Sequence, residues 1–127
     1  MNTNHLTGEV IGAAIEVHKH LGPGLLESAY EECLCHELNV RKITYEWQKQ
    51  LPISYKDVKI DLSYRLDIVV EGKIILELKA CEKIEDIYKA QSLTYLRLSG
   101  LKLGLILNLN VPVMKKGIVR VVNNFEE

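Results

Sequence analysis

The first forty residues have hydrophobic positions that recur every three or four residues, a pattern that predicts two helices. The first helix is expected from Leu6 to Leu21, and either Thr7 or Thr3 can cap its N-terminus. Gly22-Pro23-Gly24 interrupts the chain, because this tripeptide cannot continue a helix. A second helix is expected to start at once and to run to about Leu38.

The middle of the chain alternates between apolar and polar positions, which is typical of strands with one buried face. Strands are predicted at 43–48 and at 51–55, where Pro52 indicates a sheet edge. Further strands are predicted at 58–70 and 73–79, a helix at 84–98, and strands at 103–109 and 117–122. The run at 103–109 is apolar throughout and predicts a strand covered on both faces. The order α-α-β-β-β-α-β-β describes a mixed sheet with helices against it.

Composition narrows the class of protein. A chain of 127 residues is expected to form a single domain, residues 1–127. Its 47% hydrophobic and 26% charged residues are typical of a globular protein, and its apolar runs are too short to span a bilayer. The N-terminus lacks a basic stretch followed by an apolar one, so we expect no signal peptide and a cytoplasmic protein. A net charge of −1 argues against a nucleic-acid partner, although a local basic patch matters more than the sum.

Two hydrophobic runs on either side of Glu71-Gly72 carry acids where core residues are expected. Asp67 lies in the first run and Glu77 in the second. Two converging carboxylates can bind a hard divalent cation. Lys79 shares the face of Glu77, because strand side chains repeat with period two. A cation, a lysine and an attacking water make phosphodiester hydrolysis the first hypothesis; the alternative is a hairpin whose acids lie on a solvated face.

The pairing register of this hairpin separates the two interpretations. A two-residue turn at Glu71-Gly72 would pair Asp67 with Leu76, and Asp67 and Glu77 would then point to opposite faces. A three-residue loop at 71–73, or a bulge, would pair Asp67 directly with Glu77. The metal-site hypothesis therefore predicts an odd loop or a bulge.

Two helical positions bear on the same hypothesis. Gln91 falls within the apolar stripe of the third helix, so we expect it to be buried, where an unsatisfied amide costs about 1–3 kcal/mol. The stripe consists of Ile84, Ile87, Tyr88, Gln91, Tyr95 and Leu98. Gln91 is either a satisfied core residue or a group aimed at the carboxylates or their water. Tyr95, one turn later, is more typical of a core. Glu27 lies in the first turn of the second helix, where the helix dipole alone favours an acid, and Tyr30 follows it three residues later.

These motifs together resemble a known family. Gly24-Leu25-Leu26-Glu27-Ser28-Ala29-Tyr30 matches the Gly-x-x-Glu-x-x-Tyr signature of the GxxExxY proteins. Asp67, Glu77-Leu78-Lys79 and the segment from Gln91 to Tyr95 look like the remaining motifs of the PD-(D/E)XK nuclease superfamily, to which that family is assigned. The resemblance runs from about Leu6 to the end of the chain. One departure is Leu66, which stands where the superfamily's name has a proline.

The resemblance implies an α/β fold with a restriction-endonuclease-like core, a mixed β-sheet flanked by helices. It also implies a site for Mg²⁺ or Mn²⁺, because all the donors are hard oxygens. The implied ligands are Asp67, Glu77 and the backbone carbonyl of Leu78, with Glu27 contributing directly or through water.

Five other residues receive roles from the same resemblance. Lys79 would orient or deprotonate the attacking water and stabilise charge on the phosphate, and Gln91 would position the water or the lysine. Tyr95, Tyr30 and Arg65 are the candidate substrate-binding residues.

The expected function is therefore metal-dependent cleavage of nucleic acid, with DNA favoured by superfamily analogy alone. One alternative is a nucleic-acid-binding module that keeps the fold without turnover. The other is a structural or interaction protein in which the acids form a salt-bridge network with Lys79 and Arg65. We also consider a homodimer, because a compact nuclease needs two copies to cut both strands of a duplex. No membrane partner is expected.

Overall fold

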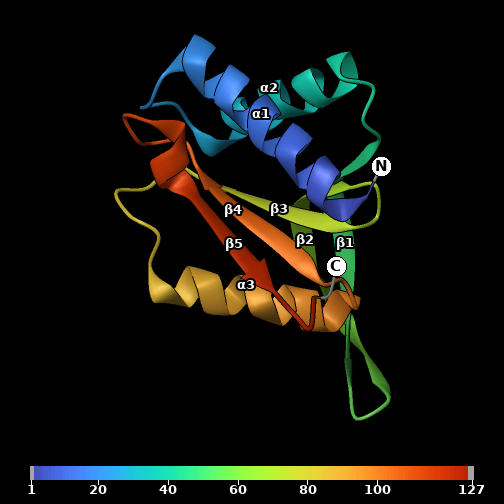
Figure 1. The fold of residues 1–127 in the computed structure, drawn as a ribbon. Helices are drawn as coiled ribbons and strands as arrows, with labels where there is room; N and C mark the ends of the chain where they lie inside the picture. The colour runs from blue at the N-terminus through green and yellow to red at the C-terminus, as the bar shows by residue number, and fades with distance from the viewer. Residues whose placement is uncertain (1, 126–127) are drawn as a thin grey trace.

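Two helices form a layer over one face of the sheet in the computed structural model, which describes residues 2–125 (Figure 1). Helix α1 spans Thr3–Leu21 and α2 spans Glu27–Val40. The expected caps of α1 are wrong: Asn2 caps it, its side chain accepting from the His5 N–H at 2.8 Å. The Asn2 side chain is short enough to reach this free first-turn donor. Glu27 is the first residue of α2, as predicted.

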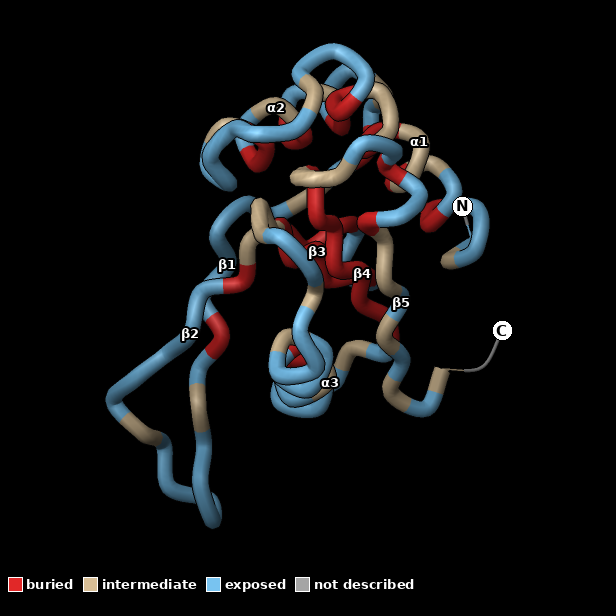
Figure 2. Tube along the Cα trace, turned by 90° about the vertical axis from the view of Figure 1, so that its left-hand side faces the viewer, coloured by how far each residue is buried: buried red, intermediate tan, exposed pale blue. Residues whose placement is uncertain are grey.

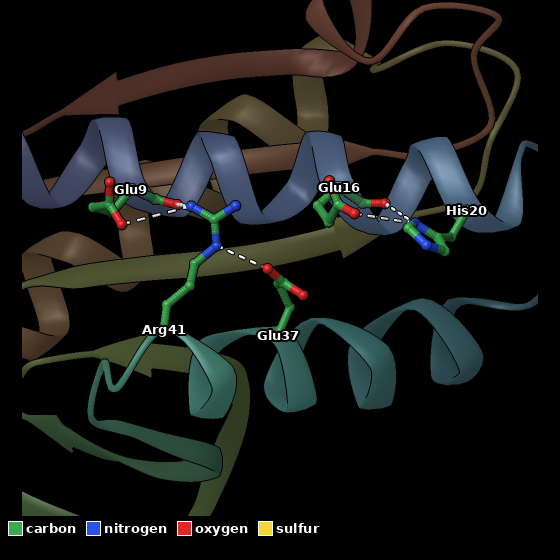
Figure 3. Close-up of polar contacts among 5 residues, drawn as sticks. All are labelled: Glu9, Glu16, His20, Glu37 and Arg41. Atoms are coloured by element: carbon green, nitrogen blue, oxygen red, sulfur yellow. Dashed lines mark hydrogen bonds and ion pairs between the residues drawn. The ribbon is translucent and has the colours of Figure 1, made fainter.

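One arginine connects α1 and α2 through its polar contacts (Figure 3). Arg41 follows α2; its Nε donates to Glu37 at 2.9 Å and a terminal nitrogen lies 3.5 Å from the Glu9 carboxylate on α1. These side chains are partly exposed, so each pair contributes at most about 1 kcal/mol. Most of the stabilisation therefore comes from the apolar residues between the helices and the sheet, which include Leu6, Val10, Leu34 and Leu38.

The sheet has five strands in the spatial order β1-β2-β3-β4-β5. The strands are β1 (Tyr45–Tyr55), β2 (Val58–Val70), β3 (Ile74–Lys79), β4 (Leu103–Asn108) and β5 (Ile118–Val122). Only β3 and β4 are parallel, and helix α3 (Asp86–Ser99) connects them across the opposite face of the sheet. The two short segments predicted at 43–48 and 51–55 are one edge strand, β1. With that merger, the predicted order and the mixed α/β sheet are confirmed.

Two hydrophobic clusters lie on the two faces of the sheet. The larger is under α1 and α2 and includes Ile68, Leu76 and Leu105; the smaller is under α3 and includes Leu66, Val69 and Leu96. All six residues of β4 are buried, as its apolar run predicted. Among residues 2–125, no helix combines the length and apolar character needed to cross a bilayer.

The β1–β2 hairpin extends beyond the body of the molecule (Figure 2). We call residues 52–64 the arm; all of them are exposed except the half-buried Ile53 and Ile60. Lys56 and Asp57 form its tip with φ of 49° and 66°. Two consecutive positive φ values are typical of the tight two-residue turn that suits a twisted hairpin. The arm is therefore a well-formed ribbon that projects from the sheet.

Candidate active site

The β2–β3 hairpin has the odd loop that the metal-site hypothesis requires. Val70 pairs with Ile74 and Ile68 with Leu76, so the loop contains three residues, 71–73. Continuing this register places Asp67 opposite Glu77. Glu71 and Gly72 adopt positive φ values of 54° and 64° within the loop. The odd loop that the metal-site hypothesis predicted is therefore confirmed. It favours carboxylates that converge, instead of a hairpin whose acids lie on a solvated face.

The strands separate at Asp67, and its carboxylate takes the place of a backbone acceptor. The β2–β3 ladder ends at Ile68, and the Leu78 N–H instead donates to Oδ2 of Asp67 at 2.8 Å. The alternation of β2 also breaks here, because Leu66 packs under α3 whereas Ile68 packs under α1 and α2. On the neighbouring β1, Gln48 has a positive φ of 57°. This irregularity turns the Asp67 side chain toward the residues that follow Glu77.

The half-buried Asp67 and the buried Glu77 form a carboxyl pair in which protonated Glu77 donates a hydrogen bond to Asp67. Burial, followed by the charge of Asp67, raises the pKa of Glu77 to about 9, and the positive charge of Lys79 opposes this rise. Burial is also the main reason that the pKa of Asp67 is raised; the Leu78 N–H opposes it, and Glu31 and Glu27 add to it. The two carboxyls cannot both be charged at neutral pH without a compensating cation.

One carboxyl oxygen of this pair has no hydrogen-bond partner. Glu77 is only 8% exposed, and its Oε1 has no hydrogen-bond partner among the residues described. A buried polar atom without a partner costs about 1–3 kcal/mol. Native structures contain few such atoms, and an absent ion is one explanation for them. The hard oxygen donors and this free position fit a divalent cation such as Mg²⁺ or Mn²⁺.

Helix α2 brings two further acids toward Asp67. Glu27 is exposed, whereas Glu31, one turn later, is 7% exposed and accepts from Trp47 Nε1 at 2.6 Å and Gln48 Nε2 at 3.4 Å. Within residues 2–125, no three His, Cys, Asp or Glu side chains are close enough to hold one metal ion. A direct bond from Glu27 to such an ion therefore has no support in this geometry, and a contribution through water stays a prediction.

Lys79 is held beside the pair by an aromatic ring. It is half-buried at the end of β3, and its Nζ lies 4.4 Å from the ring centroid of Tyr88 on α3. A cation over a ring face is stabilised by about 0.5–1 kcal/mol or more. In the described part of the chain, no ion pair within 4.0 Å joins Lys79 or Arg65 to a carboxylate. The alternative of a closed salt-bridge network is therefore contradicted.

The chain beyond Lys79 is fixed by Asn108 at the end of β4. Asn108 is 2% exposed; its side chain accepts from the Cys81 N–H at 3.2 Å and donates to the Cys81 carbonyl at 2.9 Å. The Leu109 N–H donates to the Lys79 carbonyl at 3.1 Å. These bonds join the ends of the two parallel strands and set the direction in which Lys79 leaves β3.

The prediction that Gln91 is buried is wrong. Gln91 is exposed, and the buried residues of α3 are Ser92, Tyr95 and Leu96. The stripe that rests on the sheet shares Tyr95 with the predicted one but is rotated toward Ser92 and Leu96, so Gln91 turns outward. Ile87 is 69% exposed for the same reason. A role for Gln91 toward water or Lys79 stays a prediction.

Two of the three expected substrate contacts also need correction. Tyr30 has no exposed surface; its hydroxyl donates to the Gly22 carbonyl at 2.6 Å and accepts from the Leu25 N–H at 3.1 Å. It therefore fixes the α1–α2 loop instead of contacting substrate. Tyr95 is 8% exposed and belongs to the cluster under α3. Burial, followed by the charge of Glu77, raises the pKa of the Tyr95 hydroxyl. This side chain therefore lines the site beside the carboxylates. Arg65 is exposed, as a substrate contact requires.

Two residues near the site were missed from the sequence. Glu31 could have been found from its spacing of four residues from Glu27, which puts both acids on one face of α2. Tyr88 was placed in the apolar stripe of α3, where nothing local indicates a contact with Lys79 on a strand.

Comparison with known proteins adds one match. The family model described as the PD-(D/E)XK nuclease superfamily matches residues 4–121. That range includes the site residues of α2 and α3 and the whole β2–β3 hairpin. No curated protein and no solved structure matches the chain. The narrower resemblance to the GxxExxY proteins stays an expectation.

Proposed function

Because this chain belongs to the PD-(D/E)XK nuclease superfamily, we propose that it is a metal-dependent nuclease that hydrolyses phosphodiester bonds in nucleic acids. The observation that supports this most strongly is the buried Asp67–Glu77 pair with its unpartnered Glu77 oxygen. Two neighbouring carboxyls lower the stability of the fold when both are charged. Groups with such raised pKa values cluster at functional sites. Binding a divalent cation would remove both the repulsion and the unpartnered atom.

We assign the cation to Asp67, Glu77 and the backbone carbonyl of Leu78, with Glu27 acting through water. The donors are all hard oxygens, which suits Mg²⁺ or Mn²⁺. Such an ion polarises a phosphoryl oxygen and lowers the pKa of a bound water. Superfamily analogy favours DNA as the substrate.

The chain's own residues supply the remaining chemistry. Lys79, held over Tyr88, carries a positive charge next to the carboxylates and donates hydrogen bonds to the attacking water or to a phosphate oxygen. Gln91 is exposed on α3, where its amide can orient that water, and the exposed Arg65 can bind a neighbouring phosphate. Tyr95 and Leu66 exclude bulk water from one side of the site, because both are buried in the cluster under α3.

A nucleic-acid-binding module without turnover is the second candidate. The observation in its favour is that no third acid converges with Asp67 and Glu77 among residues 2–125. Fewer direct ligands would give weaker metal binding. Activity itself separates the two candidates, because a silent module would bind nucleic acid and leave it intact.

The test is cleavage of single-stranded, duplex and branched DNA and of RNA, with Mg²⁺ or Mn²⁺ and with a chelator. We expect metal-dependent cleavage that Asp67→Asn and Lys79→Ala abolish. Asp86→Asn and Lys83→Ala are matched controls, because both residues are exposed and lie outside the pair. Absence of cleavage in every substrate, or full activity of Lys79→Ala, would contradict the proposal.

A further inference from the structure

The arm has one face that is apolar and one that is polar. Cross-strand partners share a face of the ribbon, and the register pairs Leu51 with Tyr64, Ile53 with Ile60 and Tyr55 with Val58. These three pairs occupy alternate positions of β1. The register shifts between Pro52 and Ile53, where β2 has two extra residues, Asp61 and Leu62, and because this number is even all three pairs still lie on one face. The opposite face carries polar pairs, Ser54 with Lys59 and Gln50 with Arg65.

This apolar face is solvent-exposed where the ribbon leaves the body. Tyr55 is 63% exposed, Val58 is 60% exposed and Tyr64 is 54% exposed. At its inner end the face continues into the core under α3, because the Tyr64 ring lies 5.9 Å from the ring of Tyr95 and Leu51 is buried there. A free ribbon with an apolar side is unstable in water, so its exposed side indicates a partner.

A groove lies on the same side at the base of the arm. It has a volume of about 290 Å³ and is lined by Leu51, Leu66, Val69, Leu98 and Leu101, among others. Leu98 is 42% exposed at its margin. The groove and the apolar face of the arm share Leu51, so they adjoin at the inner end of the ribbon.

The charges on the arm fit a second copy better than a phosphate backbone. Residues 52–64 carry two basic and two acidic side chains, Lys56, Lys59, Asp57 and Asp61, so the arm is neutral overall. A nucleic-acid-binding ribbon is expected to be basic, and the two aspartates would repel phosphate. In a two-fold dimer the same patch meets itself, so mixed charges can pair across the axis.

We propose that the arm is the dimerisation element of this protein, its apolar face packing against the arm and groove of a second copy. The exposed side chains provide on the order of 400 Å² of contiguous apolar surface per copy. With the groove, two copies reach the roughly 1,000 Å² expected of a specific interface. Under the proposed nuclease function, a dimer contains two Asp67–Glu77 sites, one for each strand of a duplex.

The experiment measures the mass of the purified protein without metal or nucleic acid, so it does not depend on the nuclease proposal. Size-exclusion chromatography with light scattering and sedimentation velocity would cover about 1–200 µM, the range in which an interface of this size is expected to associate. We expect a concentration-dependent dimer. The double variant Tyr55→Thr/Val58→Thr should weaken dimerisation at least about tenfold, because threonine keeps the strand preference and removes apolar contact.

A matched control comes from exposed valines elsewhere. Val40→Thr/Val113→Thr changes side chains that are 61% and 51% exposed but lie outside the arm, and it should leave the dimer unchanged. Thermal unfolding checks that both variants fold, which is expected because none of these residues is buried. A protein that stays monomeric at 200 µM, or a dimer that the arm variant leaves intact, overturns the inference. A monomer whose arm variant loses affinity for duplex DNA also overturns it and assigns the arm to nucleic acid.

Discussion

Replacing Glu77 with glutamine should stabilise the metal-free protein at alkaline pH. The pKa of Glu77 is raised from 4.5 to about 9 by burial and by Asp67, so the folded protein keeps a proton that the unfolded chain releases between these two values. Stability therefore falls as the pH rises through this window. Glutamine is neutral at every pH and of nearly the same shape, and its amide N–H can donate to Asp67 as the protonated carboxyl does.

The size of the effect follows from the burial of this side chain. Glu77 is 8% exposed, and at pH 9 its carboxyl is partly ionised in the folded protein. Leaving such a buried charge uncompensated costs at least about 1–3 kcal/mol, and neutral glutamine does not carry this cost. For a domain of this length, 1 kcal/mol corresponds to about 3–5 °C in Tm. The variant should melt about 3–15 °C above the wild type at pH 9 and at nearly the same temperature at pH 5, where the folded protein holds a neutral side chain in either case.

Differential scanning calorimetry at pH 5, 7 and 9 in the presence of a chelator measures this difference. The exposed Glu82→Gln provides the control and should not depend on pH in this way. Mn²⁺ should raise the Tm of the wild type and leave that of Glu77→Gln unchanged, because ligands stabilise the state that binds them. A Glu77→Gln variant that is less stable than the wild type at pH 9 would refute the reasoning.

Substitutions of the residues around the pair test its surroundings. Tyr88→Leu should lower kcat about two- to fivefold by removing the ring beneath Lys79, whereas Tyr88→Phe, which keeps the ring, should stay near the wild type in steady-state cleavage assays. Asn108→Ala should destabilise the fold by about 1–3 kcal/mol in urea denaturation, since it leaves backbone groups of the loop after β3 without partners. Trp47→Phe should cost a similar amount, about 1–3 kcal/mol, because it removes a donor from the buried Glu31; Glu31→Gln in the same background should recover part of it.

The local features of the fold could be predicted because they depend on short-range rules. The period-two alternation located β2 and β3, and simple counting showed that only an odd loop or a bulge brings Asp67 to Glu77. The structure has the loop at 71–73 and an irregularity at Asp67. Glu27 was placed in the first turn of α2 because Gly22-Pro23-Gly24 marks where the helix begins.

The misplaced residues depend on how elements pack in three dimensions. Gln91 and Ile87 were expected on a buried face, but the sheet selects the stripe of α3 through Ser92 and Tyr95. Glu31 is buried because Trp47, on the edge strand, donates to it. No periodicity within a helix contains that information, since the partner lies on another element.

The most direct test of the central claim is calorimetric titration of the metal-free protein with Mn²⁺ at pH 7. Titrations in two buffers of different ionisation enthalpy measure how many protons the protein releases when it binds the ion. The account predicts saturable binding that releases about one proton per ion, because the Asp67–Glu77 pair holds a proton at this pH and must lose it to bind metal. Asp67→Asn should abolish this binding. A wild type without saturable binding, or an Asp67→Asn variant that binds equally well, would contradict the assignment of this pair as the metal centre.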